Sequence, residues 1–214
     1  MDLFEAFDNF QRATSHCDNL IEVHRGYGGP AQGRRDKEVS VNRAVVVIAV
    51  ASWQAVIQDY TLACIDLSAP VPNGPLSLLT YNIIAGRVRN EVGAFSTPNA
   101  QNVRRLLIGA GFDPHPYWTW RQSAGQGQGM KTWKPGDADD RIDEWLKVRH
   151  AIAHGHDALP QVPALASVRE RRNQQPLANP TLRLVDAERC LAFFRRLARA
   201  TGTGLAIHLD VDAP

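Results

Sequence analysis

Side chains suited to proton transfer and phosphate binding gather in residues 139 to 155, which read DDRIDEWLKVRHAIAHG. The apolar residues recur at helical spacing, the acidic residues suit a helix start and the glycine suits a helix end, so we predict a helix here. Its last two turns carry Arg149, His150 and His154, and His156 follows the glycine. Histidine can accept or donate a proton near neutral pH. The planar guanidinium of arginine matches the oxygens of a phosphate group.

Helix geometry limits how these side chains can cooperate. Each residue turns an α-helix by about 100°, so His150 and His154 point within about 40° of each other. Arg149 and His154 are five residues apart and diverge by about 140°. Either these residues act independently, or a second surface completes the site.

A metal site is the first alternative for the histidines. The spacing of His150 and His154 is that of two zinc ligands on one helix, and His156 could be a third. A hydrolytic HExxH helix, however, needs glutamate after the first histidine, and this chain has Ala151 there. The sequence also contains no G-x-S-x-G elbow, no P-loop and no G-x-G-x-x-G. We therefore predict neither a metal nor a cofactor.

Apolar periodicity predicts an all-α protein, a helical bundle of about six helices. We expect Leu79, Ile83, Ile84 and Val88 to face the core, and Asp59, inside an apolar helix, to need a polar partner. Residues 112–136 and 156–184 are predicted to be two long irregular loops beside the helix at residues 139–155, which carries the arginine and the histidines. We make no structural prediction for the tail, residues 201–214. The expected helices are residues 2–24, 37–67, 76–95, a helix that starts at Pro98 after a Ser96-Thr97 cap and ends at the glycines 109 and 111, 139–155 and 185–200.

Composition indicates an ordinary folded chain of 214 residues with a net charge of +2, which we interpret as a single domain over residues 1–214. No apolar run suggests a membrane span and no basic leader precedes an apolar stretch, so we expect a cytoplasmic protein. The three cysteines Cys17, Cys64 and Cys190 are widely spaced, and we expect them to be free buried thiols.

Each of the two predicted loops carries candidate substrate contacts. Trp118 and Trp120 lie in the first loop and could stack on bases, or could instead anchor the loop to the bundle. Arg169, Arg171 and Arg172 lie in the second loop and could face phosphates, or could be a solvated charge run.

The six residues Arg149-His-Ala-Ile-Ala-His154 match the R-x4-6-H motif of the HEPN superfamily, an all-helical group rich in ribonucleases. The context WLKVRHAIAHG, with NRAVVVIAVASWQAVIQDY and FSTPNAQNVRRLLIGAGF, resembles the RiboL-PSP branch of that superfamily over roughly residues 40 to 200. The resemblance assigns the functional roles to Arg149 and His154. The position after the arginine is commonly polar in the family, often asparagine, and here it is His150. A branch modified by nucleotide transfer has tyrosine two residues after the motif histidine, where this chain has His156.

The resemblance implies metal-independent cleavage of RNA at a site shared by two chains. Attack by the ribose 2′-OH would leave 2′,3′-cyclic phosphate and 5′-hydroxyl ends. Such a homodimer could be a toxin or defence effector restrained by an antitoxin or another regulatory protein. The alternative is a non-catalytic HEPN module that binds RNA, a nucleotide or a protein partner.

Overall fold

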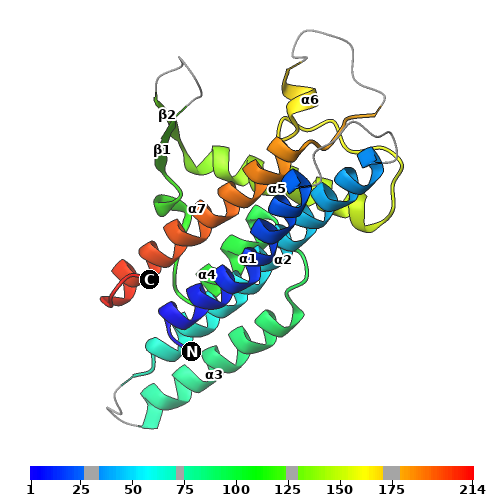
Figure 1. Ribbon diagram of the computed structural model, residues 1–214. Coiled ribbons are helices and arrows are strands. Elements are labelled where there is room, and N and C mark those ends of the chain that lie inside the picture. The colour runs from blue at the N-terminus through cyan, green and yellow to red at the C-terminus, as the bar shows by residue number, and fades with distance from the viewer. Residues whose placement is uncertain (27–33, 71–74, 124–129, 171–178) are drawn as a thin grey trace. The chain divides into compact units, whose positions relative to one another are not determined.

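The computed structural model in Figure 1 describes residues 1–26, 34–70, 75–123, 130–170 and 179–214. The all-α prediction is confirmed, because 74% of the described residues are helical, and these residues form seven α-helices, one 3-10 helix and one small sheet of two strands. The elements are α1 Leu3–Gly26, α2 Arg34–Leu67, α3 Pro75–Ala94, α4 Ala100–Gly109, the 3-10 helix η1 His115–Tyr117, β1 Trp120–Ser123, β2 Met130–Trp133, α5 Pro135–Ala153, α6 Ala166–Arg169 and α7 Leu184–Leu209.

The chain divides into two compact units. Unit 1 contains residues 1–9, 54–140 and 197–214, and unit 2 contains residues 10–53 and 141–196. The boundaries fall inside α1, α2, α5 and α7, so each of these helices contributes residues to both units. The single domain over residues 1–214 stays a prediction.

Unit 1 contains a core around the second half of α2, with Val56, Ile57, Tyr60 and Cys64 almost completely buried. The tyrosine hydroxyl donates to the carbonyl oxygen of Ala198 in α7, 3.2 Å away. Asp59 is near the side-chain amide of Asn9, whose Nδ2 donates to a carboxylate oxygen at 3.5 Å. The expected polar partner of this aspartate is therefore present, although burial still raises its pKa above the usual value.

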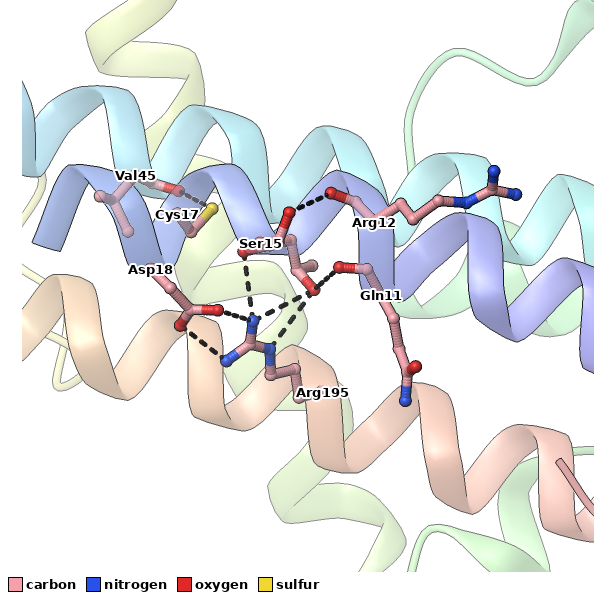
Figure 2. A network of polar contacts seen from close by, with 8 residues as sticks. Gln11, Arg12, Ser15, Cys17, Asp18, Val45 and Arg195 are labelled. Atoms are coloured by element: carbon pink, nitrogen blue, oxygen red, sulfur yellow. Dashed lines mark hydrogen bonds and ion pairs between the residues drawn. The ribbon is translucent and has the colours of Figure 1, made fainter. Parts of the chain in front are cut away.

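Unit 2 is held together by apolar packing and by polar contacts, among them those of Arg195. Trp53 and Phe194 are buried and their ring centroids are 5.7 Å apart. Figure 2 shows the guanidinium of Arg195 in α7 directed at α1, where it donates to Asp18 Oδ1 at 2.9 Å and to the carbonyl oxygen of Thr14 at 3.2 Å. A planar guanidinium can make several such bonds at once, so one side chain ties two helices together.

The end of α7 corrects one prediction. We expected the last helix to stop at Ala200, because Gly202 and Gly204 follow, but α7 continues to Leu209. At each glycine the absence of a side chain leaves space for a tyrosine ring, which a larger residue would exclude. A Cβ at Gly202 would lie 2.5 Å from the hydroxyl of Tyr60, and a Cβ at Gly204 would lie 2.5 Å from Cγ of Tyr117. Tertiary packing thus explains glycines that local propensity treats as helix breakers.

Helix α3 corrects a second prediction. Val88 is fully buried as expected, but Leu79, Ile83 and Ile84 are 55%, 64% and 42% exposed. The start of the next helix differs as well, because Asn99 caps α4 and its side chain accepts from the backbone N–H of Asn102. Ser96 to Pro98 precede this cap, so they do not form it.

The two predicted loops contain more regular structure than expected. Residues 112–136 include η1 and a hairpin in which β1 pairs antiparallel with β2. Residues 156–184 include α6. Residues 25–36, between the first two predicted helices, lie mostly outside the described residues, and α2 begins at Arg34 rather than at Lys37.

Two further expectations from the sequence can be compared with the structure. All three cysteines are free and buried, as predicted. Lys37–Leu67 within α2 is long and apolar enough to cross a membrane by length and composition alone, although half of its most apolar window is buried within the fold. The core helix of a soluble protein passes the same test, so this is weak evidence for a membrane span.

Candidate functional site

The motif lies at the carboxyl end of α5, which is closed by a defined backbone turn. Gly155 has φ +66°, a conformation that costs glycine little. The N–H of His156 donates to the carbonyl of Ala151 at 2.9 Å, and the N–H of Gly155 donates to the carbonyl of Ile152 at 3.2 Å. These two bonds form a Schellman motif, so the helix ends where the glycine predicted. His154 is the residue just before this glycine, and its side chain is exposed.

Arg149 has no acidic partner among the residues that the structure describes. Its side chain is partly buried, and its Nε is enclosed with no hydrogen-bond partner. Within the described ranges, no carboxylate forms an ion pair with this guanidinium. Arg141 on the same helix differs in this respect, because its Nε lies 3.0 Å from Oε2 of Glu144. A half-buried guanidinium with nothing to neutralise it favours an anionic ligand.

Three histidines surround the helix end. The ring centroids of His150 and His154 are 6.2 Å apart with the planes at 65°, and those of His154 and His156 are 6.0 Å apart with the planes at 28°. His150 is partly buried, while His154 and His156 are exposed. The predicted pairing of His150 with His154 on one side of the helix is therefore present.

The surroundings of His150 lower its pKa below the ordinary value of 6.5. Burial is the main cause, and electrostatic repulsion from Arg149 and His154 adds to it. This imidazole is therefore neutral at neutral pH, which is the form that can accept a proton.

The two tryptophans assigned to substrate binding have different environments. Trp118 is completely buried, and its indole N–H donates to the hydroxyl of Thr201 at 3.0 Å. The alternative in which a tryptophan anchors its segment to the fold therefore applies to Trp118. We do not assign Trp118 to substrate binding. Trp120 is partly exposed and stacks on Trp133 across the hairpin. Neither Trp133 nor Lys131, which lies against it, was assigned from the sequence. Two tryptophan-containing segments on either side of a glycine-rich stretch would have been the signal for this hairpin.

The arginines of residues 156–184 can be placed only in part. Arg169 donates from Nη1 to the carbonyl oxygens of Pro163 at 2.9 Å and Ala164 at 3.4 Å. Its guanidinium is thus used in holding its own segment. Arg171 and Arg172 lie outside the described residues.

Metal chemistry and similarity to known proteins complete the description of the site. In the part of the chain that the structure covers, no group of three or more His, Cys, Asp or Glu side chains is placed to hold a metal ion. Comparison with protein-family models, with curated proteins and with solved structures finds no match to this chain. What the residues at the end of α5 can do must therefore be argued from their own chemistry.

Proposed function

We propose that the protein is a metal-independent endoribonuclease of the HEPN superfamily, similar to its RiboL-PSP branch, that acts in the cytoplasm as a homodimer. Its biological role would be that of a toxin or defence effector controlled by an antitoxin or another regulatory protein. The observation that carries the proposal is that the partly buried Arg149, whose Nε has no hydrogen-bond partner within the described structure, lies at the same helix end as His150 and His154.

Each of these side chains has one task in the proposed reaction. Neutral His150 accepts the proton of the ribose 2′-OH, and the freed oxygen attacks the adjacent phosphorus. Arg149 stabilises the negative charge that builds on the phosphate oxygens. Protonated His154 donates to the 5′-oxygen as the P–O5′ bond breaks. The products are a 2′,3′-cyclic phosphate and a 5′-hydroxyl, and neither a metal nor an activated water is required.

Single substitutions test these assignments. We expect His154→Ala and Arg149→Ala each to reduce the rate of RNA cleavage in EDTA by about 10²-fold or more, through loss of a proton donor and of charge stabilisation. His16→Ala and Arg87→Ala are matched controls, because His16 is exposed on α1 and Arg87 is 63% exposed on α3. These controls should cleave like the wild type. DNA of the same sequence should remain intact because it lacks the 2′-OH.

Each possible failure has a distinct meaning. If cleavage is lost in EDTA and restored by zinc, the histidines hold a metal and the proposal is wrong. If the wild type binds RNA without cleaving it, the protein is a non-catalytic module. If His154→Ala lowers the melting temperature while each folded molecule keeps its activity, His154 is only a residue that closes the helix.

A shared site follows from the divergence of about 140° between Arg149 and His154 on one helix. A two-fold dimer places the arginine of one chain beside the histidine of the other. Arg149→Ala and His154→Ala chains, unfolded together and refolded in equal amounts, should then recover about one quarter of wild-type activity. Half of the random pairs are mixed, and each mixed pair has one intact site of two.

A companion mixture resolves the other arrangements. Wild-type and His154→Ala chains should retain about one half of the activity if each site uses one histidine, and about one quarter if it uses both. About one half here, with no recovery in the first mixture, would show that each chain carries a complete site. That pair of results would refute the shared site.

A further inference from the structure

The hairpin of β1 and β2 presents two different faces. In its register Trp120 is opposite Trp133 and Gln122 is opposite Lys131, whereas Arg121 is opposite Thr132. Successive side chains of a strand point to opposite faces. Trp120, Gln122, Lys131 and Trp133 therefore share one side, which we call the aromatic face. Arg121 and Thr132 lie on the other side.

Contacts within the aromatic face hold it in one arrangement. The two indole rings are nearly parallel, with centroids 5.4 Å apart and planes at 12°. The Nζ of Lys131 lies 5.0 Å from the centroid of the Trp133 ring. The Trp133 ring is thus contacted both by the indole of Trp120 and by the ammonium group of Lys131. Both tryptophans keep part of their surface exposed.

The charge of the hairpin favours an anionic partner. Residues 120–134 include Arg121, Lys131 and Lys134 but no aspartate or glutamate. Asp137 in the first turn of α5 lies 3.5 Å from Lys131 and accepts from the backbone N–H of Lys134 at 2.9 Å. Lys131 remains 54% exposed, so this ion pair is a weak one.

Much of the surface of this hairpin is exposed to solvent. Among the described residues the sheet has only two strands, and such a hairpin is at best marginally stable in water. Arg121, Gln122, Lys131 and Thr132 are all exposed. A partly exposed tryptophan beside a lysine is the combination by which proteins hold single-stranded nucleic acid, with the ring under a base and the cation near a phosphate.

We propose that the aromatic face of this hairpin binds single-stranded RNA. One unpaired base stacks on Trp120, and the adjoining phosphate contacts Lys131. The choice of RNA over other polyanions rests on the proposed function, but binding at the hairpin does not depend on cleavage. A base-paired strand cannot offer its ring surface in this way, so the face should prefer unpaired over paired RNA.

The test measures binding without cleavage. Full-length His154→Ala protein is titrated into a fluorescein-labelled uridine 12-mer, and anisotropy is followed at two salt concentrations. Adding Trp120→Ala should weaken binding by roughly 10-fold, and Trp120→Phe should keep most of the affinity because a ring remains. Adding Lys131→Gln should weaken binding less and reduce the salt dependence by about one phosphate contact.

Arg121→Gln is the matched control, because it removes the same charge from the opposite face. It should change the affinity by less than about twofold. In the variants that retain Trp120, circular dichroism of the stacked indoles reports whether the tryptophan pair is preserved. No binding of the 12-mer, or equal losses from Arg121→Gln and Lys131→Gln, would overturn the proposal. Equal affinity of Trp120→Ala and its parent would do so as well, and a protein partner would then be the better candidate for this face. If the wild type cleaves RNA while the hairpin variants bind normally, only the hairpin assignment fails.

Discussion

Gly204 offers a test in which packing should reverse the usual effect of a substitution. Replacing a helical glycine by alanine normally stabilises a protein by about 0.5–1 kcal/mol, because alanine loses less backbone freedom on folding. At Gly204 the added Cβ would lie 2.5 Å from Cγ, 2.7 Å from Cδ2 and 3.0 Å from Cβ of Tyr117. Rotation of the ring about the Cβ–Cγ bond could move Cδ2 but cannot move Cγ or Cβ away.

The expected change in the free energy of unfolding is the balance between the steric clash and the gain in helix propensity. Forcing an extra carbon into a filled space costs about 1–3 kcal/mol or more. We expect Gly204→Ala to destabilise the protein by about 1–2 kcal/mol after the gain in helix propensity of up to about 1 kcal/mol. Gly93→Ala is the control, since nothing lies within 4 Å of a Cβ at this position in α3. That variant should be stabilised by about 0.5–1 kcal/mol.

Urea unfolding followed by far-ultraviolet circular dichroism gives the comparison, provided that the denaturant slope is the same for the three proteins. The double variant Tyr117→Ala with Gly204→Ala should lose less stability than the sum of the single changes, because the clash is removed with the ring. If Gly204→Ala stabilises the protein as much as Gly93→Ala, the tyrosine does not pack on this glycine and the reasoning is refuted.

Two further predictions concern ionisable groups. His150 should titrate below pH 6.5 in a nuclear magnetic resonance experiment. Because its folded pKa is lowered, the unfolded chain binds the proton more tightly, so this residue's contribution to stability is complete above about pH 6.5 and is lost as the pH falls through its folded pKa. His150→Gln should reduce that loss of stability, and equal pH profiles of the two proteins would contradict the assignment. Burial raises the pKa of the thiols of Cys17 and Cys64 to about 11, and that of Cys190 well above its ordinary value. All three should resist a thiol reagent at pH 8 until denaturant is added, and rapid labelling of the native protein would show that a thiol is accessible.

The fold class was predictable because long apolar patterns of helical period dominate the chain, but burial was not. The pattern in α3 puts Leu79 and Ile83, which are four residues apart, on one side of the helix. It cannot indicate whether another element covers that side, so Ile83 was expected inside and is 64% exposed. Gly202 and Gly204 show the complementary difficulty, since the tyrosines that explain them are distant in sequence.

The candidate site was predictable where it depends on local geometry. The spacing of His150 and His154 fixes their common side of α5, and Gly155 marks the end of that helix. The roles of Trp118 and Trp120 were not separable by sequence, because these residues are two positions apart in one polar stretch. The difference comes from Thr201, which is 83 residues further along the chain and accepts the Trp118 N–H.

Helix α7 also constrains when the protein can complete its fold during synthesis. Residues 184–196 belong to unit 2 and residues 197–209 to unit 1, so neither unit has all its parts before this helix is made. At typical translation speeds the ribosome needs roughly 10–40 s to reach α7 from the start of the chain. During that time the buried faces of α2 and α5 lack the residues of α7 that complete their cores. Neither core can therefore close before α7, the last of the described helices, has been synthesised.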